Sequence, residues 1–406
     1  MDLLLRARSQ HLKAKLNIGG SKSESNRLLI LQAFENGIKI ENLSNSDDTL
    51  MLQKALQSEE KTIDIHHAGT AMRFLTAYYA GQPGREVILT GSNRMKQRPI
   101  HPLVDALRTL GANIQYLEKE GFPPLQITGT KIEKSEVRIP ADISSQYISA
   151  LMLLGSNLPN GLIIHLKGKI TSAPYLQMTL QLLEKVGVKT AFKDQSLQVF
   201  PSIIESKTIA VESDWSSASY FYSLAALSVS AEIELSVYHQ QSLQGDAALV
   251  EIYRQLGVET RFKEHSVVLS KNNLDRSSLI LDLNATPDLA QTIAVTCFGL
   301  GISCKLSGLH TLKIKETDRL LALQKELQKL GAEVNITQDS LSLEASNSIR
   351  EGVRIATYQD HRMAMAFAPL ALKVPILIEE AEVVSKSFPT FWKCLEKLQI
   401  IPETNP

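Results

Sequence analysis

Four stretches that end alike recur along the chain, and they limit the folds that it can adopt. They lie at residues 107–112, 183–188, 253–258 and 327–332. Each reads as the end of an amphipathic helix closed by a glycine, which readily takes the left-handed conformation that ends many helices. The four glycines are separated by 76, 70 and 74 residues. With helices that end near Gln57 and Leu398, the spacing predicts six units of roughly 68 residues each.

The residues around these glycines indicate what one unit contains. Residues 188–192, 258–262 and 332–336 alternate apolar and polar side chains, and hairpin-like returns follow at 196–199 and 340–343. Alternation of this kind is typical of strands. We therefore expect an α/β unit of two helices and about four short strands in mixed sheets.

Another helix in each unit has a polar start and an apolar body. Residues 148–154, 293–300 and 363–372 are apolar enough to be buried. A buried helix with a polar start places the positive end of its dipole at a surface. The polar starts are at 68–73, 144–147, 171–175, 216–219, 286–288, 315–319 and 360–362.

Residues 19–27 are the most distinctive of these starts. An alternating strand-like segment precedes them and an apolar run follows, which predicts strand, tight turn and helix. Ser21 can cap the helix with Glu24 in a capping box, so Lys22 and Ser23 fall in the first turn, with Arg27 near the same face. This arrangement suits a phosphate or carboxylate. A capped surface helix is the alternative, and the spacing of a Walker P-loop is absent.

Cations recur at the helix starts, which capping alone does not explain. They are Lys22, Arg27, Arg73, Lys315, Arg319 and Arg362. Ser, Thr and Asp at such positions are ordinary N-caps. If several starts face one cleft, they focus positive potential on a multiply charged anionic ligand.

Composition excludes several classes of protein. The 406 residues are expected to form two domains. The 43 basic and 43 acidic residues cancel, so no global field attracts nucleic acid or a membrane surface. Three cysteines without metal-type spacing favour a reducing compartment. Without a signal-peptide pattern or an apolar run long enough to span a bilayer, we expect a cytoplasmic protein.

Six motifs together resemble the 3-phosphoshikimate 1-carboxyvinyltransferases, or EPSP synthases. They are residues 20–27, 68–73, 94–100, 144–146, 315–320 and 360–365, and the resemblance runs from about residue 16 to about residue 397. It implies transfer of the enolpyruvyl group of phosphoenolpyruvate to the 5-hydroxyl of shikimate 3-phosphate, in chorismate and aromatic amino acid biosynthesis. The other product is inorganic phosphate. No metal or organic cofactor is implied, and the family expectation is a cytoplasmic monomer.

The fold implied by the resemblance agrees with six repeated units. It is a two-domain inside-out α/β barrel, in which each domain has three βαβαββ repeats around buried helices and a hinge closes the cleft. The chain should cross between domains near Gly19 and near residues 211–214. We thus expect one domain at 20–213 and a second formed by 1–19 and 214–406.

The resemblance also implies which residues bind the substrates. For shikimate 3-phosphate they are Lys22, Ser23, Arg27, Ser144, Ser145, Gln146, Ser172, Tyr175, Asp288 and Lys315. For phosphoenolpyruvate they are Lys22, Gly69, Arg98, Gln146, Arg319, Arg362 and Lys386. Arginine forks fit a carboxylate and a phosphate, and glycine lets backbone approach a ligand. Arg73 and His361 are expected to stand behind the contacting residues.

Two carboxylates and a lysine are the implied catalytic groups. Asp288 matches the base for the 5-hydroxyl, Glu316 the acid–base residue near C3 of phosphoenolpyruvate, and Lys22 assists at the hydroxyl and the departing phosphate. Neighbouring cations should keep Asp288 ionised. Glu316 needs burial or a nearby anion to be protonated near neutral pH.

Some positions depart from the family pattern. His67 replaces an asparagine, Phe74 follows Arg73 in place of a proline, and Thr311 stands where a substrate-contacting asparagine often lies. The stretch 57–65 is short, which predicts a trimmed hairpin in the first unit.

Two other functions remain as alternatives. A UDP-N-acetylglucosamine enolpyruvyl transferase would carry a cysteine five residues before the position of Arg98, where this chain has Asn93. A non-catalytic phospho-ligand binding protein on the same fold would be signalled by loss of Asp288 or Glu316, and both are present.

Overall fold

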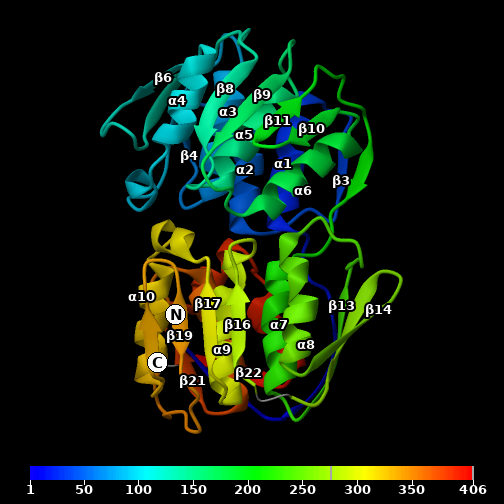
Figure 1. The fold of residues 1–406 in the computed structure, drawn as a ribbon, viewed down its shortest axis with the longest axis vertical. Coiled ribbons are helices and arrows are strands. Elements are labelled where there is room, and N and C mark those ends of the chain that lie inside the picture. The colour runs from blue at the N-terminus through cyan, green and yellow to red at the C-terminus, as the bar shows by residue number, and fades with distance from the viewer. Residues whose placement is uncertain (275–276, 405–406) are drawn as a thin grey trace. The chain divides into compact units, whose positions relative to one another are not determined.

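The computed structural model describes residues 1–274 and 277–404, which form two compact units (Figure 1). One comprises residues 20–211 and is called the inserted unit. The other contains residues 1–19 and the chain from residue 212 onward, and is called the terminal unit.

The inserted unit contains six helices, a short 3-10 turn and ten strands. They are α1 (Lys22–Phe34), β3 (Lys39–Glu41), α2 (Asp47–Gln57), β4 (Thr62–Asp64), α3 (Gly69–Ala80), β5 (Glu86–Thr90), η1 (Met95–Gln97), α4 (His101–Leu110), β6 (Asn113–Tyr116), β7 (Leu125–Thr128), β8 (Glu136–Pro140), α5 (Ser145–Gly155), β9 (Leu162–Lys167), α6 (Ala173–Lys185), β10 (Thr190–Lys193), β11 (Ser196–Val199) and β12 (Thr208–Ala210).

Two repeats of this unit have the same topology. In one sheet β4 is parallel to β5, and β7 pairs antiparallel with both β5 and β6. The second sheet has the order β10-β11-β9-β8 with the same pattern. Each repeat therefore reads βαβαββ. The third sheet has only β3 and β12, in parallel, because no hairpin follows α2. The trimmed first unit predicted from the short stretch 57–65 is confirmed.

The described part of the terminal unit holds six helices, twelve strands and five 3-10 turns. They are β1 (Leu3–Ala7), β2 (His11–Leu16), α7 (Trp215–Leu227), β13 (Ser230–Ser236), η2 (Gly245–Ala248), α8 (Leu249–Gln255), β14 (Val258–Phe262), β15 (Ser266–Lys271), β16 (Leu279–Asp282), η3 (Pro287–Leu289), α9 (Ala290–Leu300), β17 (Cys304–Ser307), η4 (His310–Ile314), α10 (Arg319–Lys329), β18 (Val334–Ile336), β19 (Leu341–Leu343), β20 (Arg354–Ile355), α11 (His361–Phe367), η5 (Ala368–Leu372), β21 (Ile376–Ile378), η6 (Ala381–Lys386), α12 (Phe391–Lys397) and β22 (Ile400–Thr404).

The N-terminal strands complete two of the three sheets here. The sheet orders are β14-β15-β13-β2, β16-β17-β19-β18 and β20-β21-β1-β22. β2 lies parallel to β13. It takes the place that β12, the strand before α7 in the chain, would take if the repeat were built from consecutive strands. Within the part of the chain that the structure describes, no sheet closes on itself.

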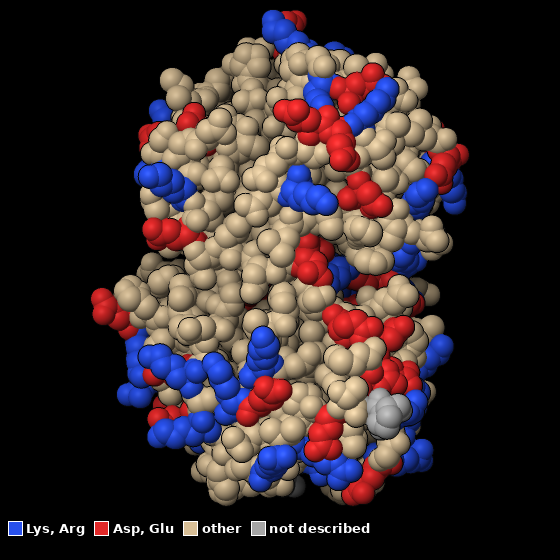
Figure 2. Space-filling view, turned by 180° about the vertical axis from the view of Figure 1, so that it is seen from behind, with Lys and Arg blue, Asp and Glu red and all other residues tan. Residues whose placement is uncertain are grey.

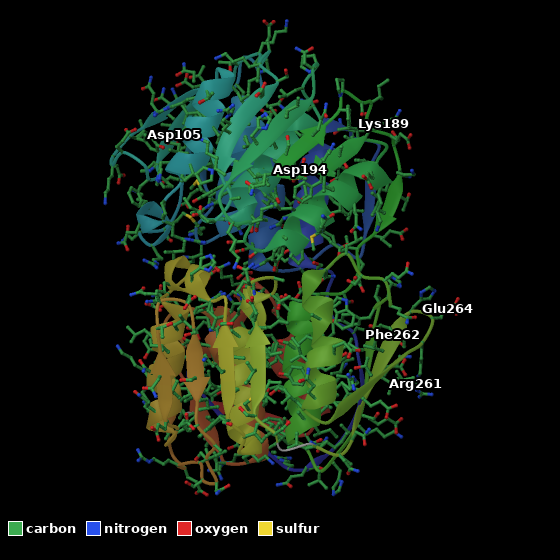
Figure 3. The ribbon with its side chains drawn as sticks, viewed as in Figure 1. Asp105, Lys189, Asp194, Arg261, Phe262 and Glu264 are labelled. Atoms are coloured by element: carbon green, nitrogen blue, oxygen red, sulfur yellow. The ribbon has the colours of Figure 1, made fainter. Side chains whose placement is uncertain are left out.

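Apolar helices form the core of each unit, as predicted. Every side chain of α11 is buried, as is every side chain of α7 except Ser216 and every side chain of α5 except Gln146. By contrast, Asp105 on α4 and Glu264 between β14 and β15 are exposed and point outward (Figure 3). The bodies of α5, α7 and α11 thus lie inside their units.

The glycines that predicted the repeats have the expected backbone. Gly111, Gly187, Gly257 and Gly331 have φ values of 106°, 83°, 76° and 99°. These left-handed values explain why α4, α6, α8 and α10 stop where they do. The predicted helix ends near Gln57 and Leu398 are also confirmed.

Surface charge is mixed, in keeping with the zero net charge. On the face shown in Figure 2, Lys and Arg side chains lie beside Asp and Glu side chains in both units. None of the helices in residues 1–274 and 277–404 is both long and apolar enough to cross a membrane.

Candidate active site

The start of α1 has the geometry that its sequence predicts. Ser21 Oγ accepts a hydrogen bond from Glu24 N at 3.4 Å, so Lys22 and Ser23 lie in the first turn. Lys22 is one-fifth exposed and its Nζ lies 3.4 Å from Asp48 Oδ2. Asp48, at the start of α2, was missed by the sequence reasoning, although an acidic pair follows Ser46 there. This partner holds Lys22 near the helix start.

Arg27 joins three helices of the inserted unit. Its Nε donates to Thr179 Oγ1 at 2.7 Å, and its Nη2 donates to Ser149 Oγ at 3.0 Å. Its guanidinium also stacks 5.8 Å from the Tyr175 ring centroid. Burial lowers the pKa of Arg27 to about 10. Arg27 therefore holds α5 and α6 against α1.

The predicted hydroxyl and amide residues gather at these starts. Ser144 caps α5 by accepting from Gln146 N, and Gln146 Nε2 donates to Thr70 Oγ1 of α3 at 3.2 Å. Ser145 opens α5, and Ser172 precedes α6 with φ 55°. The structure thus brings together the starts of α1, α3, α5 and α6.

Gly69 and Arg98 are in close contact. A Cβ added at Gly69 would lie 2.5 Å from Arg98 Nη1. Arg73 lies behind them, because its Nη1 donates to Gly69 O at 3.2 Å and its Nη2 to Pro99 O at 3.1 Å. Tyr147 Oη donates to the same Pro99 carbonyl at 2.6 Å. Arg73 and Tyr147 therefore fix the backbone that carries Arg98.

Two departures from the family pattern have local explanations. Phe74 is buried in α3, and the Arg27 guanidinium lies 5.5 Å from its ring centroid. His67 is exposed, and its Nδ1 lies 2.9 Å from Ser92 Oγ. The helix therefore continues through Phe74 without a proline.

Arg319 is the centre of a separate cluster in the terminal unit. Its side chain is 2% exposed and donates to three carboxylates. Nε donates to Asp360 Oδ2 at 2.6 Å, Nη1 to Asp288 Oδ1 at 2.8 Å and Nη2 to Glu316 Oε2 at 2.8 Å. Its own burial lowers the pKa, but Asp360, Glu316 and Asp288 together raise it above the usual value. The three acids are thereby held at fixed positions.

Asp288 is surrounded by cations. Arg362 Nη2 lies 3.2 Å from Asp288 Oδ2, and Lys315 Nζ lies 3.7 Å from Asp288 Oδ1. Burial alone would raise the pKa of Asp288, but Arg362, Lys315 and Arg319 lower it well below its ordinary range. This lowered pKa agrees with the expectation that neighbouring cations keep Asp288 ionised. Burial also lowers the pKa of Lys315, more than Asp288 raises it.

Glu316 lies between two cations. Its Oε1 accepts from Lys386 Nζ at 3.0 Å, and its Oε2 accepts from Arg319. Lys315 and Glu316 precede α10, because Asp318 caps the helix through Leu321 N and the helix begins at Arg319. Likewise α7 begins at Trp215, one residue before the predicted start, with Asp214 as its cap.

Two further residues predicted near the site are buried. His361 is 2% exposed, and its Nδ1 lies 3.7 Å from Asp360 Oδ1. Thr311 is 6% exposed, and its Oγ1 has no hydrogen-bond partner among the described residues. Among residues 1–274 and 277–404, no group of three or more His, Cys, Asp or Glu side chains is arranged to hold a metal ion.

The sequence reasoning placed Ser216 at a polar helix start without assigning it to the site, and it missed Asp246. Arg362 Nη2 donates to Ser216 Oγ at 3.3 Å, and Ser216 Oγ donates to Asp246 Oδ2. Burial, followed by the charge of Asp288, raises the pKa of Asp246 to about 6, against the opposing effects of Arg362 and Ser216. Asp246 has no sequence signal, because only the packing of η2 near α7 brings it to Ser216 and Arg362.

Asp246→Asn should change how stability depends on pH. Below about pH 4 Asp246 is protonated in the folded and in the unfolded protein. Between about pH 4 and 6 it ionises only in the unfolded protein, so its contribution to stability falls as pH rises. The asparagine variant avoids this loss, which amounts to up to about 3 kcal/mol. Its melting temperature relative to the parent should rise from pH 4 to 6 and then level off. A constant difference would contradict the prediction.

Comparisons with known proteins agree over most of the chain. The family model described as EPSP synthase (3-phosphoshikimate 1-carboxyvinyltransferase) matches residues 51–395. A 3-phosphoshikimate 1-carboxyvinyltransferase of Bacteroides fragilis is 47% identical over 402 residues, 98% of each chain. One of Sulfurovum sp. is 36% identical and covers 96% of this chain and 97% of its own.

Solved structures show the same fold. EPSP synthase of Acinetobacter baumannii aligns over 100% of both chains with a TM-score of 0.79 at 21% identity. The enolpyruvyl transferase NikO of Streptomyces tendae aligns with a TM-score of 0.74 at 13% identity, over 100% of this chain and 99% of its own. The predicted fold class is thereby confirmed. By its sequence over nearly its full length, the chain belongs to the EPSP synthase (3-phosphoshikimate 1-carboxyvinyltransferase) family.

Proposed function

We propose that this chain transfers the enolpyruvyl group of phosphoenolpyruvate to the 5-hydroxyl of shikimate 3-phosphate, in aromatic amino acid biosynthesis. Family membership over 98% of the chain carries the proposal. The cluster of Asp288, Glu316, Arg319, Arg362 and Lys386 supports it, because it combines two carboxylates with cations suited to an anionic substrate.

Helix starts of the inserted unit are proposed to bind shikimate 3-phosphate. Lys22, Ser23, Ser144, Ser145 and Ser172 offer an ammonium, hydroxyls and backbone N–H groups, which suit a phosphate and ring hydroxyls. Further contacts are proposed for Arg27, Gln146, Tyr175, Asp288 and Lys315. Arg27 already donates to three helices, so we expect its main contribution to be the positive potential at these starts.

Phosphoenolpyruvate is proposed to bind a set of arginines and lysines. These are Lys22, Arg98, Arg319, Arg362 and Lys386, with Gly69 and Gln146. Arg362 and Lys386 now pair with Asp288 and Glu316. Binding a trianion would draw these cations from their carboxylates, which weakens the effect that lowers the pKa of Asp288.

Proton transfer then completes an addition and an elimination. Asp288 removes the proton of the 5-hydroxyl while the hydroxyl oxygen bonds to C2 of phosphoenolpyruvate. Glu316 delivers a proton to C3, and the result is a tetrahedral adduct. Glu316 then removes a proton from C3 while the C2–phosphate bond breaks and the double bond re-forms. Lys22 assists at the hydroxyl and at the departing phosphate.

Phosphate release from phosphoenolpyruvate tests the proposal directly. We expect release by the purified chain only when shikimate 3-phosphate is also present, with one enolpyruvyl product per phosphate. Binding of shikimate 3-phosphate without any phosphate release would instead indicate a non-catalytic ligand-binding protein.

The organisation of the active protein is proposed separately. We infer domains at 20–213 and at 1–19 with 214–406, in a cytoplasmic monomer. Sedimentation should give a single species near the chain mass of 44.9 kDa. A stable dimer would contradict this part of the proposal.

A further inference from the structure

A buried carboxylate outside the candidate active site holds the segment that leads into α11. Glu326 of α10 is fully buried. Its Oε1 accepts from Tyr358 Oη at 2.6 Å, and its Oε2 accepts from Ala356 N at 3.1 Å and from Lys329 Nζ at 2.7 Å. A buried carboxylate is costly unless donors satisfy it, and these three do so.

All three donors are tied to one stretch of backbone. Ala356 and Tyr358 belong to the loop between β20 and α11, and Lys329 Nζ also donates to Arg354 O at 3.2 Å. Glu326 therefore anchors residues 354–358 to the body of α10. Of these contacts, the Tyr358 hydroxyl is the one nearest in sequence to α11.

The anchored segment ends in an unfavourable backbone conformation. Tyr358 and Gln359 have φ values of 55° and 56°. The left-handed region costs a residue other than glycine roughly 1–2 kcal/mol, so two in succession need support from their surroundings. The hydrogen bond from Tyr358 to Glu326 supplies such support.

This turn sets the position of Asp360. Asp360 N donates to Thr357 O at 2.9 Å, which closes the turn. Its Oδ1 then accepts from Arg362 N at 2.9 Å and caps α11, while its Oδ2 accepts from Arg319 Nε. A displacement of the turn would move the carboxylate that orients the Arg319 guanidinium and caps the helix that carries Arg362.

We propose that Glu326 and Tyr358 are positioning residues for phosphoenolpyruvate binding. They act by holding the turn at residues 357–360, and this turn places Asp360 against Arg319 and Arg362. The inference rests on the proposed function for its kinetic readout. Neither side chain contacts the acid–base pair in the described interactions. Their effect should therefore fall on the affinity for phosphoenolpyruvate and leave the chemistry largely intact.

Tyr358→Phe is the sharpest test, because it removes one hydroxyl and keeps the ring. Loss of a hydrogen bond to a buried carboxylate should raise KM for phosphoenolpyruvate by roughly tenfold. The KM for shikimate 3-phosphate and kcat should change by less than about twofold, since most of the proposed contacts to that substrate lie in the inserted unit. Glu326→Gln should show the same pattern.

Lys325→Met is the matched control. Lys325 precedes Glu326 on α10 but is exposed and takes no part in the anchor, so its loss should leave both KM values near those of the parent. Hydrogen exchange adds a readout that needs no activity: amides of residues 354–362 should exchange faster in Tyr358→Phe than in Lys325→Met.

The outcomes separate this inference from the proposed function. If the parent protein is active, a KM for phosphoenolpyruvate and a hydrogen-exchange rate in Tyr358→Phe that both match the parent would overturn the inference. Equal increases in both KM values would also overturn it. A parent protein without turnover would overturn the proposed function, and the exchange comparison would still decide whether Tyr358 holds the turn.

Discussion

Asp288→Asn should lower kcat by about 10²- to 10⁴-fold, the usual contribution of a positioned general base. Asparagine keeps the shape and one oxygen acceptor for Arg319 and Arg362, but it cannot take the proton of the 5-hydroxyl. The effect should appear in single-turnover rates of enolpyruvyl transfer. The KM for phosphoenolpyruvate should change much less.

The cations around Asp288 sharpen this expectation. They hold its pKa well below the ordinary range, so it is a weak base. Anionic substrates that engage Lys315 and Arg362 would raise that pKa. Asp288 should thus become a competent base only when both substrates are bound, which links proton removal to occupancy.

Asp318→Asn is the matched control for Asp288→Asn. Asp318 lies close in sequence to Glu316 and caps α10 by accepting from Leu321 N at 3.1 Å, a role that asparagine fills equally well. Its kcat should stay near that of the parent. If Asp288→Asn retained more than about a tenth of the parental kcat, Asp288 would not be the base.

Local sequence signals predicted the framework of both units. Ser21, Ser144 and the glycines after α4, α6, α8 and α10 act within a few residues of their own backbone, so their effects can be anticipated from spacing. The topology of the repeats followed from the resemblance. Pairing of β2 with β13, and of β12 with β3, needed the structure, because sheet partners distant in sequence leave no local trace.

The residues that the sequence reasoning did not assign to the site act through side chains that meet only after folding. Asp48 pairs with Lys22, Ser216 and Asp246 contact the Arg362 side of the cluster, and Glu326 holds Tyr358. Each looks in sequence like an ordinary polar residue at a helix start or on a helix face. Asp360 lay within a recognised motif, but its pairing with Arg319 depends on how α10 and α11 pack.

Arg319→Met should lower the free energy of unfolding of the protein by about 3–5 kcal/mol, because it leaves buried charge without its partner. The loss of stability is shared unevenly among the carboxylates of Asp288, Glu316 and Asp360. Asp288 keeps Arg362 and Lys315, and Glu316 keeps Lys386. Asp360, which is fully buried, loses the guanidinium that lay 2.6 Å from its Oδ2. The penalty should therefore come mainly from Asp360.

A double-mutant cycle can assign that penalty. Adding Asp360→Asn to Arg319→Met removes the stranded charge and should recover about 1–3 kcal/mol in denaturant unfolding, although Asp360→Asn alone destabilises the parent. Arg254→Met provides the surface comparison, since Arg254 and Glu251 are each 70% exposed and their pair is worth less than about 1 kcal/mol. If Arg319→Met lost no more stability than Arg254→Met, the charges around Arg319 would be solvated. The cluster would then bind substrate without stabilising the fold.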